Sequence, residues 1–276
     1  MLKTRIITAV VLLAVLLPAL FYPQPFAFNV VAMVLIGAAA WEWGKLNGCT
    51  QFDSILIAAC ALFICAAALF IKSFNYQITL LWLITGVSWV LAGGWLMARG
   101  PSVWLRIPKS LRLVAGIFAL CLAWLALAQA RERGIEFLLS VLLLVWVADI
   151  GAYIAGRTLG GRFFKNKLAS SISPGKTWEG VWGAVLSVLV MGIIWANASA
   201  DNLFAQISSR HGWLFFVVAV LFLVAMSVVG DLFESLVKRA AGVKDSSRLL
   251  PGHGGVLDRV DALLPTLPLA MMLVSL

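Results

Sequence analysis

Apolar runs of about 20 residues recur along the whole chain, and they constrain its fold more than any other feature. Among the 276 residues only 12% are charged, and the mean hydropathy is +1.01. A helix needs about 20 apolar residues to cross roughly 30 Å of hydrocarbon. Backbone groups in lipid must bond internally, and the runs lack the alternation of barrel strands. The sequence therefore predicts an all-α, polytopic integral membrane protein.

About nine transmembrane helices are expected, and no hydrophilic segment is long enough to form a separate soluble domain. We therefore expect residues 1–276 to form a single integral membrane domain. Its long connections are 157–180 and 233–259, which are charged, and 198–212, which is weakly charged. The expected spans are residues 6–22, 26–43, 54–71, 78–97, 113–130, 137–155, 181–197, 213–232 and 260–274.

The distribution of Lys and Arg predicts the orientation of the chain. With the N-terminus inside, the inside segments hold every Lys and Arg except Lys72, Arg131, Arg133 and Arg210. Nine spans then put the C-terminus outside and both long charged loops in the cytoplasm. Orientation alone accounts for the positive charges of residues 3–5 and 99–112, but not for the two dense clusters farther along the chain.

The denser cluster is the stretch 235–261, which lies between two apolar segments. Its bases are Lys238, Arg239, Lys244, Arg248, His253 and Arg259, and its acids are Asp245, Asp258 and Asp261. So many charges at a membrane edge indicate a site for a polyanion or a metal ion.

The acidic residues are more informative than the bases, because carboxylates contribute little to orientation. Those within or at the ends of the expected spans are Glu42, Asp149, Glu179, Asp231, Glu234, Asp258 and Asp261. An Asp at the centre of a span costs about 3 kcal/mol, so such residues are functional candidates. The alternative is a structural ion pair between helices, which stays open above all for Glu42, Glu179 and Glu234.

The spacing of four acids predicts a metal site. Asp258 and Asp261 are three residues apart and would share one helix face if a helix begins near Val256. Asp231 and Glu234 have the same spacing at the end of the preceding span. Two such pairs could converge on Mg²⁺, which prefers oxygen ligands. A zinc site has no support, since the only two histidines lie in different loops on opposite expected faces.

Two segments are candidates for binding phosphate. The first is Pro251-Gly-His-Gly-Gly255, whose glycines permit positive φ and close approach of N–H groups to an anion; a simple turn is the competing interpretation. The second, 156–180, contains a Gly-Lys-Thr sequence, but it lacks the glycine that a P-loop requires, since Ser170 stands there. What remains there is a set of hydroxyls and Lys176 beside a helix that starts near Trp178.

Metal-binding carboxylates beside two cationic loops are typical of a polyphosphate site. Because the site lies at the membrane, one substrate is expected to be a lipid. No nucleophilic Ser/His/Asp arrangement is evident, so direct phosphoryl or nucleotidyl transfer is the favoured chemistry.

These residues resemble the signature of the phosphatidate cytidylyltransferases (CDP-diacylglycerol synthases). The likeness is strong over about residues 149–265 and departs from many bacterial members at Gly175, where a basic residue is expected. The matching positions are Ser235, Lys238, Arg239, Lys244, Asp245, His253, Gly254, Gly255, Asp258, Arg259 and Asp261, together with Asp149–Tyr153, Gly156, Arg157, Lys167–Ala169 and Ile172–Gly180.

The resemblance implies phospholipid biosynthesis: CTP and phosphatidate give CDP-diacylglycerol and pyrophosphate. It implies Mg²⁺, with a monovalent cation such as K⁺ as a further cofactor. It also implies a polytopic enzyme of the bacterial inner membrane that can form a homodimer, with its active site on the cytoplasmic face. No nucleic acid partner is expected. Residues 1–130 would supply N-terminal spans, and residues 131–276 the catalytic part with its signature at 235–261.

Mapped onto this chain, the resemblance implies two sets of site residues. The catalytic residues are Asp231, Asp258, Asp261 and Lys238; the three aspartates hold the metal, and Glu234 is a further candidate ligand. The substrate-binding residues are Ser173, Lys176, Thr177, Arg239, Lys244, His253, Gly254, Gly255 and Arg259.

Two other functions are weighed against this one. A CTP-dependent lipid kinase places similar demands on the site and differs in releasing CDP instead of pyrophosphate. An ion-coupled transporter would favour acids near the bilayer midplane and an internal repeat, and the sequence has neither. CDP-alcohol phosphotransferases carry an Asp-Gly-x-x-Ala-Arg motif that is absent here.

Overall fold

The computed structural model describes residues 2–71 and 78–276, which are helical apart from loops and two isolated β-bridges. Lys72, one of the bases expected outside, is not among the described residues. The helices are α1 (Leu2–Phe21), α2 (Pro25–Leu46), α3 (Gln51–Phe70), α4 (Thr79–Arg99), α5 (Pro101–Trp104), α6 (Lys109–Arg133), α7 (Ile135–Leu159), α8 (Trp178–Ala198), α9 (Leu203–Ala240), α10 (Leu257–Val260) and α11 (Leu263–Ser275).

Within the described residues, eight helices are long and apolar enough to cross a membrane, namely α1 to α4 and α6 to α9. They correspond to the first eight expected spans, and their outer surfaces carry many exposed large apolar side chains. The prediction of an all-α polytopic integral membrane protein is therefore confirmed.

The ninth expected span, 260–274, behaves differently. It forms the 13-residue helix α11, which reaches roughly 20 Å at 1.5 Å per residue and is shorter than the hydrocarbon layer. Almost every side chain of α11 is buried, because the helix packs against α4, α6 and α9. Its apolar sequence thus serves a protein core, and periodicity alone does not distinguish such a helix from a span.

Helix α9 extends beyond the expected span at both ends. It begins at Leu203 inside the expected connection 198–212, and it bends at Gly212, whose φ of 82° departs from helical geometry. At its other end it continues eight residues past the expected end at Leu232, up to Ala240. The bases Lys238 and Arg239 therefore lie on a rigid helix and not in a loop.

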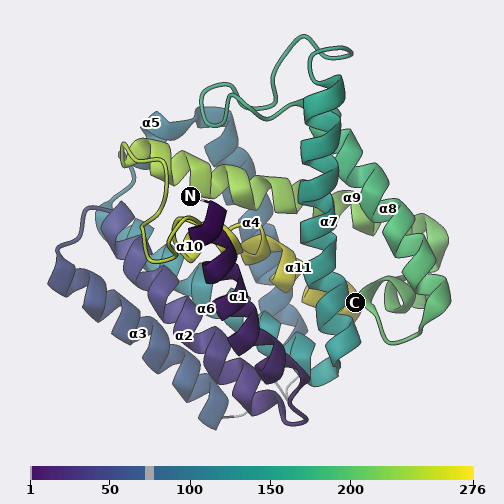
Figure 1. Ribbon diagram of the computed structural model, residues 1–276, viewed down its shortest axis with the longest axis horizontal. Helices are drawn as coiled ribbons and strands as arrows, with labels where there is room; N and C mark the ends of the chain where they lie inside the picture. Colours follow the sequence, from purple (N-terminus) through teal and green to yellow (C-terminus); the bar gives the residue numbers. More distant parts are fainter. Residues whose placement is uncertain (1, 72–77) are drawn as a thin grey trace.

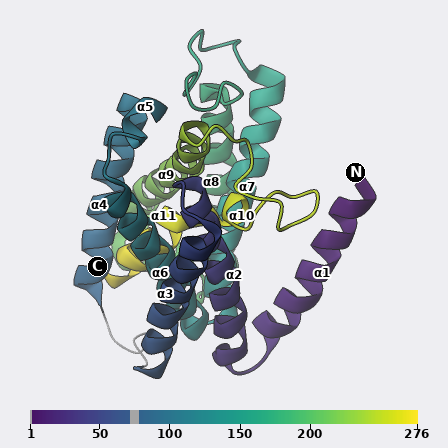
Figure 2. The ribbon, with the colours of Figure 1, turned by 90° about the vertical axis from the view of Figure 1, so that its left-hand side faces the viewer.

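The long loops gather at one end of the bundle. Figure 2 shows α5, the loop between α7 and α8 and the loop after α9 in its upper part, while the α1–α2 connection lies at the bottom. Helix α1 leans away from the other helices, but its side chain Thr8 donates a hydrogen bond of 2.9 Å to the carbonyl of Pro251 (Figures 1 and 2). The two charged loops are thus brought to the same end of the fold.

Helices α7 and α8 pack closely because small residues face each other across their interface. A Cβ added at Gly183 would lie 2.7 Å from the carbonyl oxygen of Gly151 and would also overlap Ala155. Small residues let membrane helices approach in this way. The close contact fixes α7, which carries Asp149, beside the start of α8.

We expect Gly183→Leu to force α7 and α8 apart and to lower stability by about 1–3 kcal/mol or more, because an overpacked contact must be relieved by backbone movement. Thermal unfolding in detergent measures this effect. Gly94→Leu is the matched control, since a Cβ at Gly94 meets no atom within 4 Å. Equal unfolding temperatures for the two variants would contradict the packing argument.

Candidate active site

A buried carboxylate from the N-terminal half anchors the signature loop. Glu42 of α2 is 0% exposed, and its two oxygens accept the backbone N–H groups of Val256 and Leu257 at 2.9 and 2.7 Å. The hydroxyls of Ser246 and Ser247 donate to the same carboxylate at 3.1 and 2.5 Å. Four donors satisfy a charge that would otherwise be costly to bury.

A second carboxylate, Asp258, holds the same loop together by accepting hydrogen bonds from other residues of the loop. One of its oxygens accepts from the backbone N–H and hydroxyl of Ser246, at 2.9 and 2.8 Å, and from the N–H of Gly255 at 2.8 Å. The other oxygen pairs with Lys238 at 2.5 Å. Burial alone would raise the pKa of Asp258, but hydrogen bonds from Lys238, Gly255 and Ser246 hold it well below its usual range.

The glycines of this loop are required by the two carboxylates. Gly254 has a φ of 82°, and a Cβ at Gly255 would overlap both Glu42 and Ser246. Arg259 donates to the backbone oxygen of His253 at 3.1 and 2.6 Å and so closes the turn. In this structure the N–H of Gly255 is bonded to the chain's own Asp258, and the expected binding of an external anion by this segment stays a prediction.

Three carboxylates interact with one another near the face of α9 that also carries Lys238. Asp231 acts electrostatically on both Asp149 of α7 and Asp261, which follows α10. Burial, followed by the negative charge of Asp231, raises the pKa of Asp261 to about 7. The only positive charge bonded to this acidic cluster, among the described residues, is the ammonium of Lys176, 2.5 Å from Asp231.

A cavity of about 340 Å³ opens beside the acidic cluster, between α7, α8, α9 and the loop before α8. Asp149, Tyr153, Lys176, Thr177 and Asp231 contribute its polar lining. Its volume lies within the range of pockets that hold small-molecule ligands.

The loop before α8 is folded by local hydrogen bonds. Ser173 donates its N–H to Ala169 at 2.8 Å, and the hydroxyl of Thr177 caps α8 by accepting from Gly180 at 3.2 Å. Glu179 of α8, 4% exposed, accepts the N–H groups of Phe163 and Phe164, both at 3.0 Å. Glu179 therefore has the structural role that the sequence left open.

The structure brings the two predicted clusters together. Lys176 of the segment 156–180 pairs with Asp231 of α9, just before the stretch 235–261, and the guanidinium of Arg239 in that stretch lies 3.4 Å from the carbonyl of Ile172. Lys238 also pairs with Glu234, 2.5 Å away on the same helix. Lys244 is exposed at the edge of the loop and contacts none of these groups.

The donor set fits a hard cation in chemistry, since Asp149, Asp231 and Asp261 offer oxygens at one place. As they stand, however, no three His, Cys, Asp or Glu side chains among residues 2–71 and 78–276 are arranged to hold a metal ion. Asp258, an expected ligand, has both oxygens engaged by Lys238, Ser246 and Gly255. The magnesium site remains a prediction.

Three residues that build the site were not among the predicted site residues: Glu42, Asp149 and Ser246. Glu42 and Asp149 carry a visible signal, because each is an acid inside an otherwise apolar run. Ser246 carries none, since a serine in a charged loop is most often solvated.

The fold and the site together define a polytopic membrane protein with paired acidic and basic side chains beside a cavity at one end of its helical bundle. The sequence profile of the cytidylyltransferase family matches residues 3–276, and the chain belongs to this family.

Several relatives are named phosphatidate cytidylyltransferase. The one from Pseudomonas aeruginosa is 35% identical over 97% of this chain and 95% of its own length. The one from Haemophilus influenzae is 36% identical, with 97% and 96% covered. The one from Brucella suis is 36% identical, with 95% and 89% covered. The likeness therefore extends over nearly the whole of each protein.

We expect Glu42→Gln to loosen the signature loop. The glutamine side chain has only one oxygen that can accept hydrogen bonds, and its NH2 group would face N–H and O–H donors. Each donor left unsatisfied costs about 1–3 kcal/mol. Limited trypsin digestion reports the effect through cleavage after Lys244 and Arg248, which are both exposed. Glu132→Gln, a change of the same kind at an exposed position, should digest like the parent protein. Unchanged cleavage in Glu42→Gln would rule out the anchoring role.

Proposed function

We propose that this protein transfers the cytidylyl group of CTP to phosphatidate, giving CDP-diacylglycerol and pyrophosphate. Its membership of the cytidylyltransferase family supports this proposal. The observation that carries it at the site is the junction of the loop before α8 with the end of α9. There Lys176 pairs with Asp231 at the 340 Å³ cavity, and Arg239 donates to the carbonyl of Ile172.

In this reaction the nucleophile comes from the substrate. A phosphate oxygen of phosphatidate attacks the α-phosphorus of CTP, a new P–O bond forms, and the bond to the β-phosphate breaks to release pyrophosphate. The contribution of the protein is positioning and charge neutralisation. We assign this role to Lys176, Lys238, Arg239 and Arg259, with Lys244 at the entrance.

We further propose Mg²⁺ as the cofactor, bound through the carboxylates of Asp231 and Asp261 with Asp149 beside them. Such an ion would offset charge on the phosphates. Asp258 can bind this ion only if Lys238 releases one of its carboxylate oxygens. While that pair is formed, Asp258 holds the conformation of the loop. A monovalent cation such as K⁺ is kept as a second expectation.

The distribution of positive charge supports a cytoplasmic site. The loops 157–180 and 233–259 lie at the same end of the fold and hold ten of the 21 Lys and Arg residues. We propose that this end faces the cytoplasm and that the protein resides in the bacterial inner membrane. A homodimer remains an expectation from the resemblance.

The identity of the second product separates this activity from that of a CTP-dependent lipid kinase. Detergent-solubilised protein is incubated with phosphatidate and with CTP labelled in the α-phosphate, with and without Mg²⁺. We expect the label to enter the lipid fraction and unlabelled pyrophosphate to appear in equal amount, only when Mg²⁺ is present. Release of labelled CDP would instead identify a kinase.

Asp261→Asn tests the acidic cluster without a large change in packing. Removing one of several repelling carboxylates should leave the unfolding temperature unchanged or higher, while activity should fall by more than about 100-fold. Asp201→Asn, at an exposed position in the connection before α9, is the control for the same chemical change. An Asp261→Asn enzyme that keeps near-normal turnover would remove this carboxylate from the site.

A further inference from the structure

A second and larger cavity lies away from the charged site, between α4 and α6. It has a volume of about 550 Å³, and its lining is almost entirely apolar. Along α4 the lining residues run from Leu81 to Leu96, which is roughly 22 Å of helix. The apolar side chains Trp95, Leu111 and Phe118 line it and are about half exposed, so the groove opens toward the lipid-facing side of the bundle.

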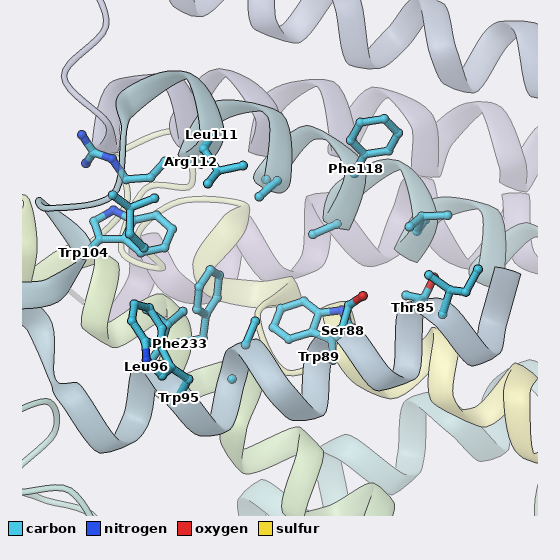
Figure 3. A pocket seen from close by; sticks show the side chains of 18 of the residues that line it. Thr85, Ser88, Trp89, Trp95, Leu96, Trp104, Leu111, Arg112, Phe118 and Phe233 are labelled. Atoms are coloured by element: carbon cyan, nitrogen blue, oxygen red, sulfur yellow. The ribbon is translucent and has the colours of Figure 1, made fainter.

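Aromatic rings close the inner wall of the groove. Phe233 of α9 contacts Trp89 and Trp104 edge to face, with ring centroids 5.4 and 5.5 Å apart, and stacks on Trp43 at 6.0 Å. Figure 3 shows Phe233 and Trp104 between the helix that carries Arg112 and the one that carries Trp89. These rings fill the space between α2, α4, α5 and α9.

The groove is separate from the 340 Å³ cavity. The two cavities share no lining residue. Both cavities touch α9, where Phe233 lines the groove and Asp231 lines the smaller cavity. Side chains two residues apart on a helix point in directions roughly 200° apart, so these two lie on opposite faces of α9. A ligand in the groove would therefore not occupy the position of the reacting phosphates.

One end of the groove carries a buried arginine. Arg112 is only 9% exposed, its buried Nε has no hydrogen-bond partner, and its side chain forms no ion pair within the described residues. Its one recorded contact lies over the ring of Trp104, 5.9 Å from the centroid. Figure 3 shows Arg112 at the Trp104 end, while Thr85 and Phe118 lie toward the other end. A buried N–H group without an acceptor is costly, and a ligand anion at this end of the groove would supply one.

The chain around Arg112 is basic and has no compensating acid. Arg99, Arg106, Lys109 and Arg112 lie within 14 residues that contain no Asp or Glu. Orientation in the membrane explains exposed bases such as Arg99 and Arg106. It does not explain why Arg112 is withdrawn from solvent into the end of an apolar groove.

We propose that this groove binds an anionic phospholipid of the surrounding bilayer, different from the phosphatidate that is converted. One acyl chain lies between α4 and α6, and the phosphate of the headgroup pairs with Arg112. A single leaflet contributes about half of the roughly 30 Å hydrocarbon layer, a depth that the groove exceeds. The lipid would join α4 and α6 to the aromatic wall against α9.

Native mass spectrometry of delipidated protein in detergent tests the proposal, with dioleoyl-phosphatidylglycerol and dioleoyl-phosphatidylcholine as competing probes. We expect the parent protein to retain one phosphatidylglycerol in preference to phosphatidylcholine. Arg112→Gln should lose that preference by about tenfold or more, because a charge-assisted contact is removed. Arg106→Gln, an exposed arginine of the same segment that does not line the groove, should keep it.

A second pair of variants tests the groove without touching the charge. Ala115→Phe places a ring in the groove and should abolish retention of both lipids, whereas Ala59→Phe, on the exposed face of α3, should not. The proposal would be overturned if the parent protein retained both lipids equally. It would also be overturned if Arg112→Gln and Arg106→Gln showed the same preference for phosphatidylglycerol. A raised KM for phosphatidate in Arg112→Gln would overturn it too, because it would make the groove a substrate site. Lipid retention is measured without turnover, so its result does not depend on whether the proposed reaction is correct.

Discussion

The hydrogen bonds of Glu42 are the interaction on which the site depends. They join α2 to residues 246–257, which lie more than 200 positions later in the chain. A buried carboxylate without partners would destabilise α2 by several kcal/mol, and the N–H groups that begin α10 would lose their acceptors. Each side therefore requires the other, and the signature loop cannot fold correctly unless the N-terminal helices are already packed.

Asp258 extends this arrangement toward the bases. Ser246 donates its hydroxyl to Glu42 and its backbone N–H to Asp258, and Asp258 in turn pairs with Lys238 of α9. The loop is thus part of one polar network that runs from α2 to α9, with the aromatic wall of Trp43 and Phe233 packed against it. Fully bonded networks of this kind specify a single geometry, whereas partly bonded ones do not.

Much of the fold and the composition of the site follow from local patterns in the sequence. Apolar runs identified eight spans, and acids within apolar runs identified Asp231 and Asp261. Hydrogen-bond partners did not follow, because they depend on which helices pack together. The segment 251–255 was expected to bind phosphate, which stays a prediction. In the structure the N–H of Gly255 bonds Asp258 and the next two N–H groups bond Glu42, partners that local sequence does not determine. The apolar segment 260–274 likewise looked like a span and proved to be a buried helix.

Lys176 and Lys238 are already paired with carboxylates, so a phosphate that binds either lysine must replace a carboxylate. A phosphate that reaches Lys176 competes with Asp231 for the ammonium. Once released, Asp231 repels Asp149 and Asp261 more strongly, because Lys176 no longer offsets its charge. A divalent cation would remove that repulsion and would be attracted by it. If a phosphate substrate and a cation bind here as proposed, this geometry would couple their binding and would favour their arrival together over the arrival of either alone.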